Sequence, residues 1–295
     1  MTQLIGAAFG SDPDPVKHAQ KIGAQCFQIQ VGDPQGWKKP ALDFPGGAKE
    51  LLAQAKELKM DIYIHAAYVI NVASTNNRIR IPSRKLLQQT VDLAAEVNAK
   101  GVIVHGGHVT KDDDPASGFD NWRKACEQTE MHVPVLIENT AGGSHAMART
   151  KENLTNLWKS VGHTNVGFCF DTCHGWAAGI ELKTAIKELK AITKRIDLIH
   201  ANGSRDEFDS SRDRHSNFAE SLLPQDEIAQ VVKDCSLIWC GDYSADRGSG
   251  SVPAFIAAEL SIDQALGLVE IDVPLETQLP IKALRRLDGG RREQI

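Results

Sequence analysis

The sequence predicts an α/β protein built as a closed (β/α)8 TIM barrel. An atypical or incomplete eighth unit is an alternative that the sequence does not decide. Three observations lead to this prediction. Short apolar runs recur eight times, and helical patterns lie between them. The runs are apolar on both faces, as in parallel strands that helices cover. Eight such units within 295 residues also suit this barrel in size. An open, doubly wound sheet is the alternative.

The expected strands are rich in β-branched and aromatic residues, and turn residues bound them. In chain order they cover residues 4–9, 26–31, 61–66, 101–106, 133–138, 166–171, 196–201 and 236–242. The helices expected between them are amphipathic, with apolar residues at helical spacing. They include residues 47–58, 83–98, 154–161 and 182–192.

The composition is that of a soluble globular protein, with 42% hydrophobic and 24% charged residues. No apolar stretch approaches the roughly 20 residues that a membrane span needs, and no secretory signal is recognisable, so we expect a cytoplasmic protein. The net charge of −5 argues mildly against bulk electrostatic binding of nucleic acid. Six scattered cysteines without a CxxC motif are expected to be reduced.

Polar side chains stand where consecutive strands are expected to end. In a barrel the carboxyl ends of all strands converge on one face, where active sites lie. Five consecutive strands would therefore deliver imidazoles and carboxylates to one rim. These residues are His65, His105, Glu138, Asp171 with His174 just beyond it, and His200.

Imidazole and carboxylate ligands together suit Zn²⁺, Mn²⁺ or Fe²⁺ better than Mg²⁺ or Ca²⁺. Asp213 and His215 lie two positions apart in an extended segment, so their side chains are expected on the same side. They bring the number of candidate ligands to eight, enough for a cluster of two or three metals. Such clusters commonly hydrolyse phosphate esters.

Five stretches resemble the endonuclease IV family of apurinic/apyrimidinic (AP) endonucleases, in its actinobacterial form, over residues 1–222. They are YIHAAYVINVASTNNRIRIPSR (63–84), VIVHGGH (102–108), IENTAGG (137–143), GFCFDTCHGWAAG (167–179) and DLIHANGSRDEFDSSRDRH (197–215). The resemblance implies a TIM barrel with a trinuclear zinc site on the same eight residues. It also implies deoxyribonuclease IV (phage-T4-induced type) activity, which cleaves the phosphodiester 5′ to an abasic site and leaves a 3′-hydroxyl. Glu138, expected to bridge metals, is the best candidate to orient the attacking water.

The resemblance also implies double-stranded DNA as the partner and a monomeric protein. Tyr68 and Val69 match positions that insert into the base stack, although ordinary loop packing is the alternative. Arg78 belongs to a basic stretch expected to contact phosphate, together with Asn76, Arg80, Arg84 and Lys85. Ala8 stands where the family usually has a histidine, and Gln35 where many members have a basic residue.

Past about residue 222 the chain departs from the family pattern. Residues 236–295 instead resemble a fragment of the electron-transfer flavoprotein β subunit, through the stretches CGDYSADRGSGSVPAF and RRLDGGRRE. We therefore expect a barrel over residues 1–235 and a divergent C-terminal segment over 236–295. The family's ninth ligand, a glutamate, would fall to Asp242 by position or to Glu276, if to either.

Two other functions stay open at this point. A sugar isomerase or epimerase could use the same barrel, but would not need the pair Asp213 and His215. An inactive chimeric protein would lack the full metal site. Metal content and substrate distinguish these hypotheses.

Overall fold

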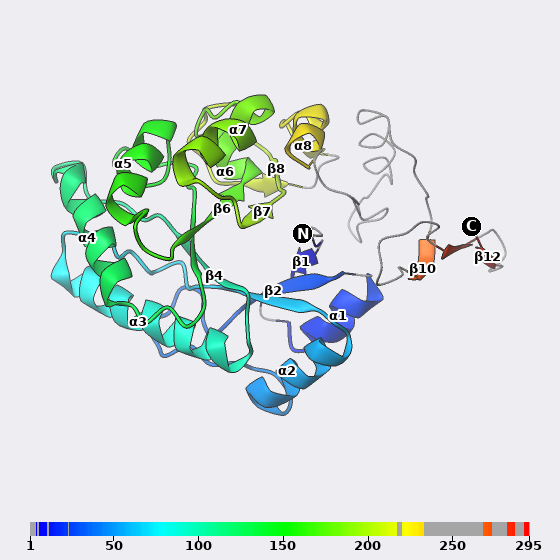
Figure 1. The fold of residues 1–295 in the computed structure, drawn as a ribbon. Helices are drawn as coiled ribbons and strands as arrows, with labels where there is room; N and C mark the ends of the chain where they lie inside the picture. The colour runs from blue at the N-terminus through cyan, green and yellow to red at the C-terminus, as the bar shows by residue number, and fades with distance from the viewer. Residues whose placement is uncertain are drawn as a thin grey trace.

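The computed structural model describes residues 4, 6–10, 12–22, 24–216, 220–232, 268–272, 282–286 and 292–294 of the chain. Its main feature is a curved sheet of seven parallel strands that pair in sequence order (Figure 1). The strands are β1 (Gly6–Ala8), β2 (Cys26–Gln30), β3 (Asp61–His65), β4 (Gly101–His105), β5 (Val135–Glu138), β6 (Gly167–Asp171) and β7 (Leu198–His200).

Helices cover the outer side of this sheet, so that strands and helices form two concentric layers (Figure 1). The helices are α1 (Pro15–Lys21), α2 (Gly47–Glu57), α3 (Asn77–Glu96), α4 (Pro115–Gln128), α5 (Lys151–Val161), α6 (Thr172–Ala177), α7 (Leu182–Thr193) and α8 (Gln225–Val232). Parallel strands alternating with outer helices confirm the predicted α/β barrel architecture. Within the described residues, β1 and β7 are the edges of the sheet, which forms a half-barrel. The eighth strand expected at 236–242 lies outside the described residues.

The two faces of each strand have different surroundings because successive side chains alternate. Residues such as Phe27 and Ile29 face outward and join the main core beneath the helices. Inward-facing residues form a second, smaller core inside the barrel, made of Tyr63, Ile103, Leu136, Cys169 and Leu198. Each lies two positions before a polar strand-end residue, in the order His65, His105, Glu138, Asp171 and His200. The polar side chains thus stand on an apolar layer.

One helix begins well before its predicted start. Helix α3 begins at Asn77, six residues before the expected start at Ser83, because the Asn76 side chain accepts a hydrogen bond from the Arg78 amide. Pro82 lies inside the helix and removes one donor without ending it. Helix α4 lies between β4 and β5, where a helix was expected without stated bounds, and Asp114 before Pro115 is its start signal.

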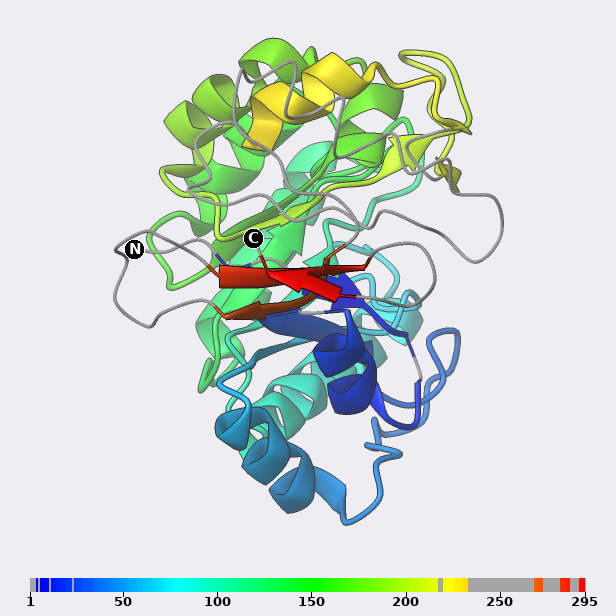
Figure 2. The same ribbon diagram turned by 90° about the vertical axis from the view of Figure 1, so that its right-hand side faces the viewer.

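Two smaller sheets complete the described residues. Strands β8 (Gly203–Ser204) and β9 (His215–Ser216) pair antiparallel beyond the end of β7. Strands β10 (Leu268–Asp272), β11 (Lys282–Arg286) and β12 (Arg292–Gln294) form an antiparallel sheet, whose strands lie side by side in Figure 2.

The described cysteines agree with the expected reduced state. Cys26, Cys126, Cys169 and Cys173 are free and buried. Cys235 and Cys240 lie outside the described residues. Among the described residues, no helix is long and apolar enough to cross a membrane.

The indole of Trp122 connects the helical layer to the end of β4. Trp122 on α4 is fully buried, and its Nε1 donates a hydrogen bond of 2.6 Å to the Gly106 carbonyl, directly after His105. We expect Trp122→Phe to lower the free energy of unfolding by about 2 kcal/mol, because it leaves a buried carbonyl unpaired and a small cavity. Denaturant unfolding would measure the change.

The matched control is Trp37→Phe, since Trp37 is 48% exposed. This substitution is expected to change the unfolding free energy by less than about 0.5 kcal/mol. Equal effects of the two substitutions would show that the buried hydrogen bond of Trp122 does not stabilise the fold.

Candidate metal centre

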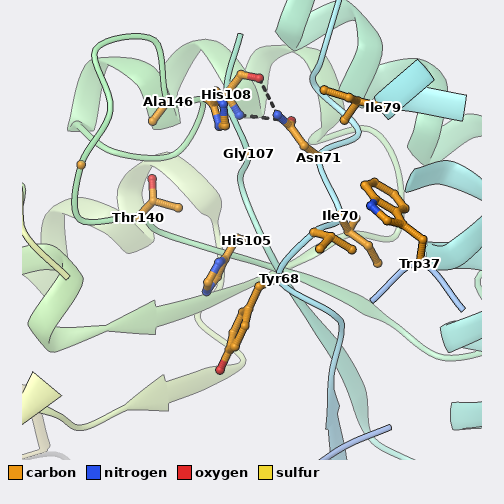
Figure 3. A pocket seen from close by; sticks show the side chains of 12 residues that line it. Trp37, Tyr68, Ile70, Asn71, Ile79, His105, Gly107, His108, Thr140 and Ala146 are labelled. Carbon is orange, nitrogen blue, oxygen red and sulfur yellow. Dashed lines mark hydrogen bonds between the residues drawn. The ribbon is translucent and has the colours of Figure 1, made fainter. Parts of the chain in front are cut away.

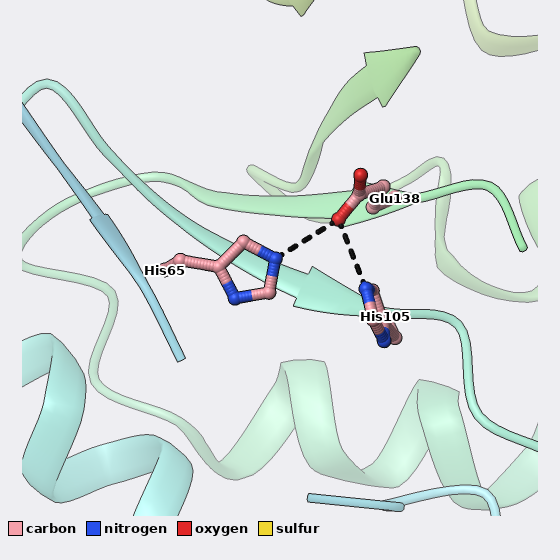
Figure 4. A group of neighbouring side chains, drawn as sticks. All are labelled: His65, His105 and Glu138. Atoms are coloured by element: carbon pink, nitrogen blue, oxygen red, sulfur yellow. Dashed lines mark hydrogen bonds and ion pairs between the residues drawn. The ribbon is translucent and has the colours of Figure 1, made fainter. Parts of the chain in front are cut away.

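The carboxylate of Glu138 lies at the centre of the strand-end residues and is 1% exposed. Its Oε2 is 3.1 Å from Nε2 of His65 and 3.3 Å from Nε2 of His105 (Figure 4). Its Oε1 is 2.8 Å from Nδ1 of His200 and 3.6 Å from Nδ1 of His174. The carboxylate therefore faces four imidazoles delivered by different elements of the barrel.

A second group gathers around Asp171 and His174. His174 Nε2 is 3.1 Å from an oxygen of Asp213, and His215 Nε2 is 3.2 Å from the other oxygen of that carboxylate. His215 Nε2 also lies 3.8 Å from Asp171 Oδ2. Asp213 and His215 therefore lie on the same side of their segment, as their spacing predicted. Arg214 between them bonds Asp206 instead, with Nε 2.8 Å from its Oδ2.

Asp171 is both the last residue of β6 and the N-cap of α6. Its Oδ1 accepts a 2.9 Å hydrogen bond from the His174 amide, which begins the short helix that carries His174. Its Oδ2 accepts a 2.6 Å hydrogen bond from the side-chain Nδ2 of Asn202. Asn139 bonds the Asp171 backbone on both sides, through its Oδ1 at 2.7 Å and its Nδ2 at 3.0 Å.

The loop that carries Asp213 is fastened to α6 and to the start of α5. Trp176 Nε1 donates to the Asp206 carbonyl at 3.0 Å, and Ser211 donates its amide to the Ala177 carbonyl at 2.8 Å. The guanidinium of Arg149 donates to Ser211 Oγ at 2.6 Å. These contacts hold the loop in place before any ligand binds.

Burial and charge act against each other on the acidic and basic groups of the site. Burial disfavours the Glu138 carboxylate, but His200, His105 and His65 outweigh it and hold its pKa well below the ordinary 4.5. Burial likewise disfavours the imidazolium of His174, but Asp171, Asp213 and Glu138 raise its pKa to about 10. The hydrogen bond that His215 donates to Asp213 raises the pKa of His215 to about 11.

The donor set fits a divalent metal. Five overlapping groups of three side chains each bring one donor atom apiece within 4.8 Å of one another. Together these groups contain all eight residues expected from the sequence, and in addition Cys169 and Cys173. Buried imidazoles beside carboxylates are the ligand chemistry of zinc, manganese and iron sites.

Several polar residues of the site were missed by the sequence reasoning, namely Gln28, Asn139 and Asn202. Asn139 directly follows Glu138, and Asn202 lies two positions after His200, so their nearness to strand ends was an available signal. Gln28 gave no such signal because it lies within β2. The alternative ninth ligands Asp242 and Glu276 lie outside the described residues.

A pocket of about 400 Å³ opens beside His105 (Figure 3). Tyr68 and Val69 line it, with Trp37 and Ile79 among the other lining residues. Tyr68 is 50% exposed, and its ring stacks on that of His105 with 5.5 Å between ring centroids. Arg78 directly precedes the pocket residue Ile79. It lies in the first turn of α3 and is exposed.

The turn after β4 shapes one side of this pocket. Asn71 donates to the His108 carbonyl at 2.9 Å and accepts from the His108 amide at 3.2 Å (Figure 3). Gly107 between them has a φ of 65° and approaches Asn71 so closely that a Cβ would lie 2.4 Å from its Oδ1. This turn therefore requires glycine.

A TIM barrel whose strand ends gather histidines and carboxylates defines a class of metal-site barrel enzymes. A family model described as "Xylose isomerase-like TIM barrel" matches residues 16–236. Probable endonuclease 4 of Mycobacterium ulcerans (strain Agy99) is 48% identical over 259 residues, 88% of this chain and 99% of that protein. Its counterpart in Mycobacterium tuberculosis (strain ATCC 25177 / H37Ra) is 50% identical over 254 residues, 86% and 97% of the two chains. The chain belongs to the endonuclease 4 family.

Solved structures show the same fold. Endonuclease IV from Thermus thermophilus has a TM-score of 0.68 and 23% identity, covering 79% of this chain and 88% of that one. A D-tagatose 3-epimerase-like protein has a TM-score of 0.64 and 18% identity, covering 78% and 86%. At these identities the likeness concerns the fold alone. The match to the Mycobacterium ulcerans protein spans 88% of the chain, so it extends beyond residue 222, where we had expected the resemblance to end.

The raised pKa values of His174 and His215 predict a pH dependence for the metal-free protein. The folded chain keeps these protons up to about pH 10, whereas the unfolded chain releases them near 6.5. The two histidines therefore contribute stability that is fully present below pH 6.5 and is lost as the pH rises toward 10. We expect chelator-treated protein to lose thermal stability over this range.

Metal-loaded protein is the control, because metal ligation removes the same protons at every pH tested. Its melting temperature should show no such fall over this range. Identical pH profiles for the chelated and loaded forms would contradict the expected proton competition.

Proposed function

We propose that the protein is a metal-dependent AP endonuclease of base excision DNA repair. It would hydrolyse the phosphodiester 5′ to an abasic site and leave a 3′-hydroxyl, the deoxyribonuclease IV type of reaction. The observation that carries the proposal is the meeting of eight imidazoles and carboxylates at the carboxyl-end face of this barrel, from strand ends, α6 and the segment beyond β7. The near 50% identity to proteins named probable endonuclease 4, over almost their whole length, supports it.

We further propose zinc as the metal, with two or three ions per chain and Mn²⁺ or Fe²⁺ as alternatives. The ligands would be His65, His105, Glu138, Asp171, His174, His200, Asp213 and His215. When bound, the ions would lower the pKa of a water molecule and neutralise charge on the phosphate oxygens. The overlap of the ligand groups at Glu138 and at His174 supports more than one ion.

Glu138 is the proposed catalytic residue. Its carboxylate is buried and stays ionised, because three histidines hold its pKa low. A carboxylate in that state can accept a hydrogen bond from the attacking water and direct its lone pair at phosphorus. His105, at the edge of the site, would face the phosphate side next to the pocket.

Tyr68, Val69 and Arg78 are the proposed DNA-binding residues. Tyr68 and Val69 line the pocket beside His105, where an inserted ring and an apolar side chain could replace a missing base in the stack. Tyr68 is anchored for this role, since its amide donates to the Pro34 carbonyl at 2.7 Å. Arg78 is exposed and free to reach a phosphate.

A sugar epimerase is the second candidate function, because a D-tagatose 3-epimerase-like protein and a D-psicose 3-epimerase share this fold. The pair Asp213 and His215 argues against it, because a sugar site with one or two metals does not need them. A duplex containing one abasic site separates the two. Metal-dependent nicking 5′ to the site, with an end that a polymerase extends, supports the endonuclease. Epimerisation of a ketose without nicking would refute it.

The divergent segment 236–295 stays a proposed unit apart from the barrel over 1–235. The end of the family model at residue 236 and the antiparallel pairing of β10–β12 support this division, whereas the match to the Mycobacterium ulcerans protein runs past its start. The likeness to the electron-transfer flavoprotein β subunit rests on the two quoted stretches alone. We also propose a monomer, located in the cytoplasm with its DNA substrate.

Glu138→Gln tests the proposed catalytic role. The substitution keeps size and removes charge, so we expect nicking to fall by at least about 1000-fold, equivalent to about 4 kcal/mol. Steady-state nicking of abasic duplex would measure it, with metal content determined on the same samples. Glu130→Gln, at an exposed position before β5, is the control and should nick normally. Unimpaired nicking by Glu138→Gln would remove Glu138 from the mechanism.

Arg78→Ala tests the proposed phosphate contact. We expect weaker binding to all duplexes and a salt dependence of binding reduced by about one phosphate contact. Fluorescence anisotropy at several salt concentrations would measure both. Lys56→Ala, at the exposed end of α2, is the control for loss of one positive charge. Equal effects of the two substitutions would mean that only net charge matters.

A further inference from the structure

Gln28 contacts a candidate ligand from across the barrel. It lies in β2, faces inward, and places its Oε1 2.8 Å from Nε2 of His200 at the end of β7. Strands β2 and β7 are not neighbours in the sheet, so the side chain reaches His200 through the barrel interior. The residue beside Gln28 in register is Ala8, a small side chain on the same face.

The two nitrogens of His200 both face oxygen acceptors, charged carboxylates at Nδ1 and a neutral amide at Nε2. Nδ1 faces carboxylates, with Glu138 Oε1 at 2.8 Å and Asp171 Oδ2 at 3.8 Å. Nε2 faces the amide oxygen of Gln28. An imidazole that binds a metal through one nitrogen carries a proton on the other, and an acceptor for that proton fixes the ring.

Two other histidines of the site follow the same rule with backbone acceptors. His65 Nδ1 is 2.8 Å from the Ala66 carbonyl and turns its Nε2 toward Glu138. His174 Nδ1 is 2.8 Å from the Asn139 carbonyl and turns its Nε2 toward Asp213. In His200 the acceptor is the Gln28 side chain, and it bonds Nε2, whereas the backbone acceptors bond Nδ1.

Resting on the proposed function, we propose that Gln28 is a positioning residue of the metal centre. Its amide oxygen holds the proton of His200 on Nε2 and so leaves the Nδ1 lone pair free for the ion held with Glu138. Gln30, the other inward-facing glutamine of β2, does not share this task, since its amide donates to the Tyr68 hydroxyl at 2.7 Å.

The test compares Gln28→Met with Gln28→Glu in the zinc-loaded full-length protein. Methionine keeps the length but lacks the acceptor, so zinc retention against a chelator should weaken by about 10- to 100-fold. Glutamate keeps an acceptor and should restore retention. Nitrogen NMR of labelled histidines should show His200 as the Nε2–H tautomer in the wild type. Its Nε2 proton should exchange slowly there and rapidly in Gln28→Met.

Gln30→Met is the matched control, and should leave zinc retention and the His200 tautomer unchanged. Unchanged retention in Gln28→Met, or an Nδ1–H tautomer of His200 in the wild type, would overturn the proposal for Gln28 alone. A wild-type protein that retains none of zinc, Mn²⁺ and Fe²⁺ would overturn it together with the proposed function. The wild-type tautomer is decisive even if Gln28→Met does not fold.

Discussion

The buried carboxylate of Glu138 is the constraint on which the rest of the site depends. An ionised carboxylate removed from water is costly unless cations or donors surround it. Here imidazoles from β3, β4 and β7 surround it, with His174 of α6 nearby. Each comes from a different crossover of the barrel, so the charge of Glu138 can be compensated only when the strands stand in their native order.

The apolar layer beneath the site makes this arrangement possible. Tyr63, Leu136 and their neighbours fill the barrel interior two positions before the polar residues. They exclude water from below and fix the height at which each imidazole and carboxylate emerges. Because the parallel strands pair in register, His105 lies beside Glu138 and Asp171 beside His200, and the strand-end side chains form a ring of donor atoms.

Much of this could be predicted from the sequence, because the relevant signals are local. An apolar run that ends in His105 or Glu138 shows both the strand and the rim to which it delivers its last side chain. The start of α3 was predicted too late because Pro82 resembles a helix boundary, whereas the cap at Asn76 lies six residues earlier. Gln28 could not be found in this way. Its role depends on a contact with a residue 172 positions away, and no local pattern records it.

The fastening of the segment 205–214 has a consequence for the energetics of ligand capture. Its bonds to Trp176, Ala177 and Arg149 are made within the chain itself. The conformational entropy of placing Asp213 and His215 is therefore lost during folding, and little remains to be lost when an ion arrives. The site is therefore preorganised for metal binding. Release and rebinding of an ion should require no refolding of the segment.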